Sequence, residues 1–268
     1  MSVRVGTTLV AVLLLAALPL SAGYHYQAVT TTEGDGGMGD LVVEGWVSGD
    51  RAKVLFKEAK SDQPFLGKGS YLLTRDGGST VYLVNPEKRT YSEWDMGAMV
   101  QSLGAMMEAL GGLATIELSD PEVTKLSEEP GPTMLGMPTR HLKFRTSYSI
   151  SVRVMGMGST MHHVDEEEIW VTETLEDAAF RVWLQGGLAR TGHEELDRLI
   201  RAQIGKVDGV PLKYVSVSTI TDERSGRPQT TRTATEVTKL ERTSVPDSTF
   251  ELPQGYEQTP LLPEMPNF

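Results

Sequence analysis

The sequence predicts one mainly β domain of the α+β class, built from antiparallel strands together with two or three helices. Apolar and polar residues alternate in short runs that turn signals interrupt roughly every 8–12 residues. The clearest run covers residues 139–154, where Tyr148, Ile150 and Val152 alternate with serines. Such a strand has one dry face and one wet face. A single Met-rich segment, residues 95–113, follows a helical period instead.

The first half of the chain predicts a meander of five or six antiparallel strands. They cover residues 24–32, 41–47, 51–58, 70–74, 80–84 and 90–94. Ser48-Gly49-Asp50 predicts a hairpin between the second and third strands. Asp76-Gly77-Gly78 predicts a tight turn, because Asp-Gly sequences readily supply positive φ angles.

The helix predicted over residues 95–113 has an apolar face at spacings of three and four. That face consists of Met96, Met99, Val100, Leu103, Met106, Met107, Leu110 and Leu113. Gly97, Gly104 and Gly111 form a second stripe along the segment, and each lowers helix propensity by about 1 kcal/mol relative to alanine. The helix therefore depends on packing for its stability.

The second half predicts strands over residues 139–154, 168–174, 212–221 and 230–240, and a surface helix over residues 193–204. Residues 175–188 fit more than one structure. Gly-x-Pro precedes two of the long strands, at Gly136 and at Gly209. The chain from Pro246 onward is rich in proline, which predicts an extended tail.

The N-terminus has the order of a secretory signal. Residues 9–18 form an unbroken apolar run, and Leu20-Ser21-Ala22-Gly23 offers small residues for cleavage. Spanning a bilayer takes roughly 20 apolar residues, about twice this run. We therefore expect residues 1–23 to be a signal peptide, residues 24–256 a single β domain and residues 257–268 an extended tail, with no integral membrane segment after cleavage.

Composition excludes several functions. The chain of 268 residues has no cysteine, so it forms no disulfide, thiolate metal site or iron–sulfur cluster. Its 36 acidic residues outnumber 25 Lys+Arg, which argues against a nucleic-acid partner. The absence of cysteine also suits a protein exported to an oxidising compartment.

Three features together resemble a known family. They are the Gly-x-Pro turns before strands, the Tyr-rich hairpin of residues 81–91, and the ending Val-Pro-Asp-Ser-Thr-Phe-Glu-Leu-Pro-Gln-Gly-Tyr at residues 245–256. They are similar to an uncharacterised family of exported bacterial proteins that resembles the periplasmic lipoprotein carriers (LolA-like). The resemblance implies a large open antiparallel half-barrel with two or three helices packed in its concave face around an apolar cavity. None of these motifs is catalytic.

Two other motifs have competing interpretations. Residues 34–39 match G-x-G-x-x-G, but a strand is expected to follow, whereas a dinucleotide site needs a helix there. Two histidines and four carboxylates lie within His162–Glu168, and in a strand His163, Asp165 and Glu167 share one face. This segment is either a solvated acidic turn, which we favour, or a site for a divalent metal.

No nucleophile–base motif is present, so we expect no enzyme activity, catalytic residue, metal or cofactor. Methionines are flexible and suit surfaces that accept varied apolar groups, although ordinary core packing explains them as well. Our leading hypothesis is a periplasmic or secreted protein that binds or carries lipid or an acylated protein. The alternative is a structural module that docks a peptide or partner on its concave face. The residues expected to line the cavity are Met96, Met99, Leu103, Met106, Leu110, Ile150, Val152 and Trp170.

Overall fold

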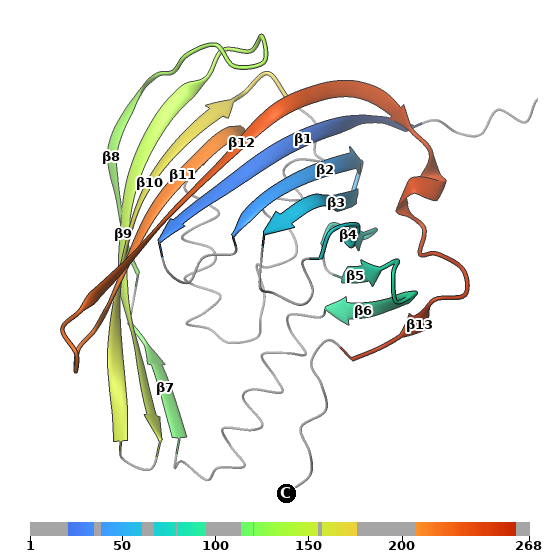
Figure 1. Ribbon diagram of the computed structural model, residues 1–268. Helices are drawn as coiled ribbons and strands as arrows, with labels where there is room; N and C mark the ends of the chain where they lie inside the picture. Colours follow the sequence, from blue (N-terminus) through green and yellow to red (C-terminus); the bar gives the residue numbers. More distant parts are fainter. Residues whose placement is uncertain are drawn as a thin grey trace, which may run out of the picture.

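The computed structural model describes residues 21–34, 39–60, 67–78, 80–94, 114–119, 121–154, 157–175 and 207–260. These residues form one curved sheet of thirteen strands (Figure 1). The strands of the first half are β1 (Ser21–Gly34), β2 (Asp40–Ser48), β3 (Arg51–Lys60), β4 (Tyr71–Thr74), β5 (Val81–Asn85) and β6 (Thr90–Trp94). Those of the second half are β7 (Ala114–Leu118), β8 (Glu122–Pro130), β9 (Arg140–Val154), β10 (Met157–Thr172), β11 (Val210–Asp222), β12 (Pro228–Val245) and β13 (Glu257–Gln258).

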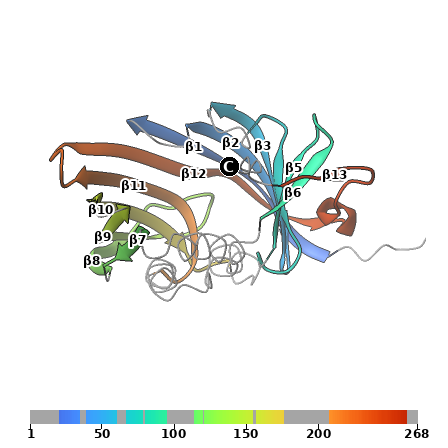
Figure 2. The same cartoon turned by 90° about the horizontal axis from the view of Figure 1, so that it is seen from below.

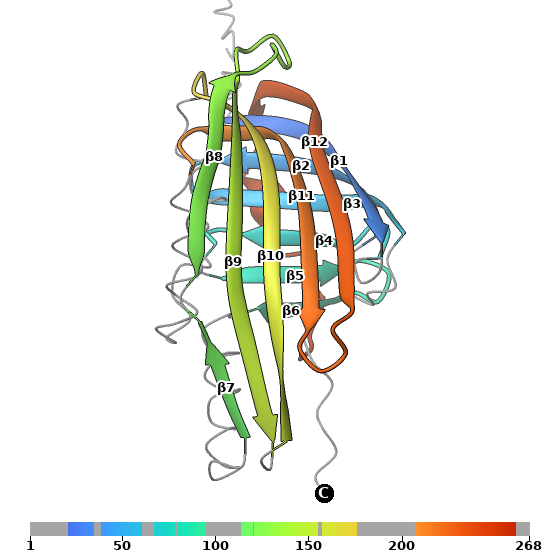
Figure 3. The ribbon, with the colours of Figure 1, turned by 90° about the vertical axis from the view of Figure 1, so that its left-hand side faces the viewer.

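The sheet has two meanders that meet where the first strand pairs with a strand near the end of the chain. Its order is β13-β6-β5-β4-β3-β2-β1-β12-β11-β10-β9-β7, with β8 also on β9. Figure 3 shows β8 and β7 lying on the same side of β9, one beyond the other. All of these pairings are antiparallel except that of β13 with β6. The two edges of the sheet do not pair with each other, and Figure 2 shows the sheet as an open arc.

The sequence prediction of the fold is wrong in one respect. Two or three helices were expected in the concave face, but the described residues are nearly all β. Their only helical element is the single 3₁₀ turn η1 (Asp247–Phe250). The segments predicted as helices, residues 95–113 and 193–204, lie outside the described residues. None of the described elements is a helix with the length and apolar content needed to cross a membrane.

Most predicted strands are confirmed, and β6 has the predicted bounds. Residues 1–20 lie outside the described ranges, and β1 begins at Ser21, so the predicted cleavage point falls in its first residues. The two predicted Gly-x-Pro turns lead into β9 and β11. Gly136 and Gly209 have φ angles of 78° and 106°, a region that side chains disfavour, which explains glycine at both positions.

The C-terminal tail covers one face of the first meander. Phe250 of η1 is only 1% exposed and packs against Tyr71, Leu73, Val84 and Val245. Beyond η1, β13 pairs with β6 at the sheet edge. We call the face beneath this tail the outer face, since Figure 2 shows η1 outside the arc. The opposite face is called the inner face.

Candidate functional site

Both meanders place apolar side chains on the inner face. On the first meander these include Leu41, Val43, Val47, Val54 and Phe56, which alternate along paired strands. On the second meander the buried inner-face cluster consists of Leu142, Phe144, Ile169 and Val171. The strands β1, β12 and β11 between them are rich in inward threonine and serine. The inner face is therefore apolar on both sides of a polar stripe.

The structure separates the predicted cavity-lining residues. Ile150 and Val152 lie on the inner face of β9, opposite Met161 and Ser159. Trp170 lies on the outer face, because its neighbours Ile169 and Val171 point inward and are buried. The five remaining residues, Met96, Met99, Leu103, Met106 and Leu110, lie outside the described residues. A cavity-lining role for this set stays a prediction.

The segment His162–Glu168 is strand, not the solvated turn that we favoured. It pairs on both sides, with β9 and with β11. Alternation places His163, Asp165 and Glu167 on the inner face, as a strand requires. Within the described ranges, however, no group of three or more His, Asp or Glu side chains is arranged to hold a metal ion.

These inward side chains form a polar group beside the apolar cluster. Glu167 is 5% exposed and accepts a hydrogen bond of 2.6 Å from the Tyr214 hydroxyl. Burial, and then the charge of Glu167, raises the pKa of Tyr214, so this phenol remains protonated. The ring of His163 stacks on Tyr148, with centroids 4.7 Å apart. Sequence alternation could place these groups on one face, but only strand register shows which of them meet.

The outer face carries a cluster that spans three consecutive strands. His25 of β1 stacks on Trp46 of β2, with centroids 5.2 Å apart, and its Nε2 lies 2.8 Å from Glu44. From β3, Lys53 lies over the Trp46 ring, and Lys57 forms a 3.2 Å ion pair with Glu44. The cluster links β1, β2 and β3 by side chains as well as by backbone hydrogen bonds.

A second outer cluster repeats this arrangement on the other meander. His141 of β9 stacks on Trp170 of β10, with centroids 4.2 Å apart, and its Nε2 lies 2.8 Å from Glu168. Lys213 of β11 lies over the Trp170 ring, and Lys143 forms a 3.2 Å ion pair with Glu168. In both clusters the glutamate precedes the tryptophan by two residues, and histidine and lysine occupy the flanking strands. Trp170 thus has a position in an outer-face cluster.

The two glutamates make stability depend on pH. Burial tends to raise the pKa of Glu44 and of Glu168, but hydrogen bonds from lysine and histidine outweigh it, so both pKa values are lowered. A carboxyl with a lowered pKa stabilises the fold above its unfolded pKa and stops doing so as the pH falls through its folded pKa. We expect the free energy of unfolding in urea to fall between about pH 5 and about pH 3. The double variant Glu44→Gln/Glu168→Gln should show a shallower fall.

The matched control is Glu58→Gln on β3, since Glu58 is exposed and has no ion pair among the described residues. This variant should follow the pH dependence of the unaltered protein. A double variant with an undiminished fall would contradict the assignment to these two carboxyls.

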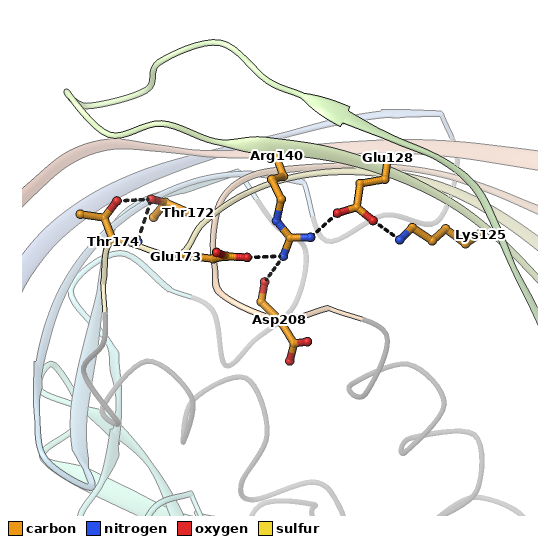
Figure 4. A network of polar contacts seen from close by, with 7 residues as sticks. All are labelled: Lys125, Glu128, Arg140, Thr172, Glu173, Thr174 and Asp208. Carbon is orange, nitrogen blue, oxygen red and sulfur yellow. Dashed lines mark hydrogen bonds and ion pairs between the residues drawn. The ribbon is translucent and has the colours of Figure 1, made fainter.

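A third network joins four strands at one end of the second meander (Figure 4). Arg140 of β9 pairs with Glu128 of β8, lies 2.8 Å from Glu173 just after β10, and donates to the backbone carbonyl of Asp208 just before β11 at 3.1 Å. Lys125 also pairs with Glu128. Hydrogen bonding to Glu128 raises the pKa of Arg140. Because Lys125, Glu128, Arg140 and Glu173 all form ion pairs within the network, we assign this network to structure and not to binding.

Comparison with known proteins gives a family match over part of the chain but no activity. A family model described as a domain of unknown function (DUF4412) matches residues 157–256, from β10 to the tail after η1. No curated protein matches the chain. The match confirms the resemblance to an uncharacterised family that the sequence indicated.

The similar solved structures are remote. One is a putative outer membrane lipoprotein-sorting protein domain from Vibrio parahaemolyticus, with 11% identity, a TM-score of 0.32 and coverage of 85% of this chain and 88% of that one. Another is a DUF1329 family protein from Desulfovibrio piger, with 9% identity, a TM-score of 0.30 and coverage of 87% and 90%. The structure of PNGF-II has 13% identity, a TM-score of 0.36 and 90% coverage of this chain, which spans only 31% of that chain. At these TM-scores the similarities carry no argument about activity.

Proposed function

We propose that this protein binds or carries an apolar ligand, such as a lipid or the acyl chain of a lipidated protein, on the inner face of its sheet. The observation that carries the proposal is the apolar inner face of a curved sheet whose two edges do not pair. The apolar side chains on either side of the polar stripe give this concave face the kind of lining that a long apolar chain requires. No nucleophile–base motif occurs in the sequence, so the proposed role is non-enzymatic.

The proposed location is the cell envelope, in the periplasm or beyond it after secretion. Support comes from the apolar run at residues 9–18 and from the absence of cysteine. An excess of acidic residues would keep such a carrier from adhering to anionic membranes.

Native mass spectrometry of the purified protein tests the proposal directly. We expect masses that correspond to bound lipid, and we expect the protein to increase the fluorescence of N-phenyl-1-naphthylamine, an apolar probe. Protein that is free of lipid and also fails to bind the probe would contradict the proposal.

Two adjacent valines provide a matched pair of variants. Val43 lies on the inner face of β2, opposite Ala28 and Phe56, whereas Val42 lies on the outer face. We expect Val43→Asp to weaken probe binding about tenfold or more, because a carboxylate loses hydration against an apolar ligand. Val42→Asp should bind as the unaltered protein does. Circular dichroism of both variants checks that they fold, and equal binding by the two would place the ligand elsewhere.

A further inference from the structure

The inner face of the second meander contains three polar side chains in adjacent register. Thr146 of β9 lies directly opposite Asp165 of β10, and the next inward pair is Tyr148 with His163. In an antiparallel sheet such partners project from the same face, with Cβ atoms roughly 5 Å apart. Thr146, His163 and Asp165 therefore surround one small area beside the apolar cluster.

The hydrogen-bonding capacity of this group is not used within the described residues. Thr146 is 0% exposed, yet its Oγ1 has no hydrogen-bond partner, and the buried Nε2 of His163 has none either. Asp165 is half-buried and has neither a hydrogen bond nor an ion pair there. A buried polar group without a hydrogen-bond partner destabilises a protein. A ligand that supplied the missing bonds would recover part of the lost stability.

The surrounding titratable groups indicate what kind of ligand fits. Burial lowers the pKa of His163, although Asp165 opposes this, and so favours a neutral ring. Burial, then Asp165 and Glu167, raise the pKa of Tyr148 and keep it protonated. A neutral histidine, a threonine hydroxyl and a carboxylate oxygen can each accept a hydrogen bond. The group that best satisfies all three is a hydrogen-bond donor.

We propose that Thr146, His163 and Asp165 form a subsite for the polar head group of the apolar ligand, and that this head group donates hydrogen bonds through a hydroxyl or an ammonium. The inference rests on the proposed function, since it assumes that an apolar chain lies on the adjacent inner face. The chain would lie along the buried cluster that includes Phe144 and Ile169. The head group would then meet the three side chains where the cluster ends.

Displacement of N-phenyl-1-naphthylamine by three probes with the same sixteen-carbon chain tests the subsite. We expect 1-monopalmitoylglycerol or hexadecylamine to compete about tenfold better than methyl palmitate, which has no donor. Thr146→Val and His163→Phe preserve shape and stacking, and each should reduce this preference about 3–10-fold, the value of one hydrogen bond. Competition by methyl palmitate should stay unchanged. Asp165→Asn distinguishes a hydroxyl head group from an ammonium head group. It should weaken competition by hexadecylamine more than competition by 1-monopalmitoylglycerol only if an ammonium binds at the site.

The control variant is Thr221→Val on the outer face of β11, which should leave all three probes unaffected. Urea unfolding separates a binding role from a structural one. Thr146→Val should not lower stability, because it removes a buried hydroxyl that has no partner. Equal competition by the three probes, or an equal loss for all three in Thr146→Val, would overturn the subsite and leave the proposed function intact. Failure of every probe to bind would overturn both.

Discussion

Replacing Phe250 by alanine should lower the free energy of unfolding by about 3–5 kcal/mol, the usual range for loss of a buried phenylalanine. Its ring is 1% exposed and fills the outer-face cluster around Leu73 and Val84. The Arg51 guanidinium lies 4.9 Å above the ring centroid, so the variant also loses a cation–π contact. Because η1 has no other buried residue, we expect the tail to detach from the sheet.

Urea denaturation monitored by circular dichroism measures this loss. Leu126→Ala on β8 is a suitable control, since Leu126 is 55% exposed and its truncation should change stability by no more than about 0.5 kcal/mol. If the two variants were equally stable, the packing of the tail on the sheet would be incorrect.

The second large effect is expected at Gly45, where even a methyl group should destabilise the protein by about 1–3 kcal/mol. Gly45 pairs with Tyr26 across β1 and β2, and the Tyr26 ring lies directly over it. A Cβ at this position would overlap the ring atoms. The ring cannot easily move, because it packs against Val47 and Ala52. The same burial raises the pKa of the Tyr26 hydroxyl.

A double-mutant cycle isolates this effect. We expect Gly45→Ala to lower the urea midpoint in the unaltered protein but to have little effect in a Tyr26→Ala background, where the ring is absent. An equal fall of the urea midpoint in both backgrounds would mean that the destabilisation comes from the backbone of β2. It would then not come from overlap of the added methyl group with the Tyr26 ring.

The sequence predicts strands well where alternation and turn chemistry agree. Thr90–Trp94 follows a turn and alternates, and the structure confirms its bounds. β8 was missed because it is mostly polar, with charges along a strand that, among the described strands, pairs only with β9. Edge strands gain little from apolar burial and often carry charges that prevent further pairing. β10 was predicted too short, because its His- and acid-rich half is held in the sheet by pairing on both sides and not by strand propensity.

The candidate site was harder to predict than the fold. Ile169, Trp170 and Val171 form a continuous apolar run, and such a run does not show which residues point inward. The structure shows which residues of this run point inward, since Ile169 and Val171 are buried on the inner face. The roles of Thr146 and Asp165 depend on which residue of β9 lies opposite which residue of β10. That register is fixed by pairing across the sheet, and no local pattern in either strand specifies it.

The pairing of β1 with β12 has a consequence for how the chain folds. Ser21 lies opposite Val245 and Gly34 opposite Thr231, so β1 can pair only with residues that lie 197 to 224 positions later in the chain. Contacts this distant in sequence close large loops and are associated with slow folding. During synthesis on the ribosome, the first meander would emerge before β12, which pairs with β1, and before the tail that covers its outer face. The native sheet can therefore form only after nearly the whole chain has been synthesised.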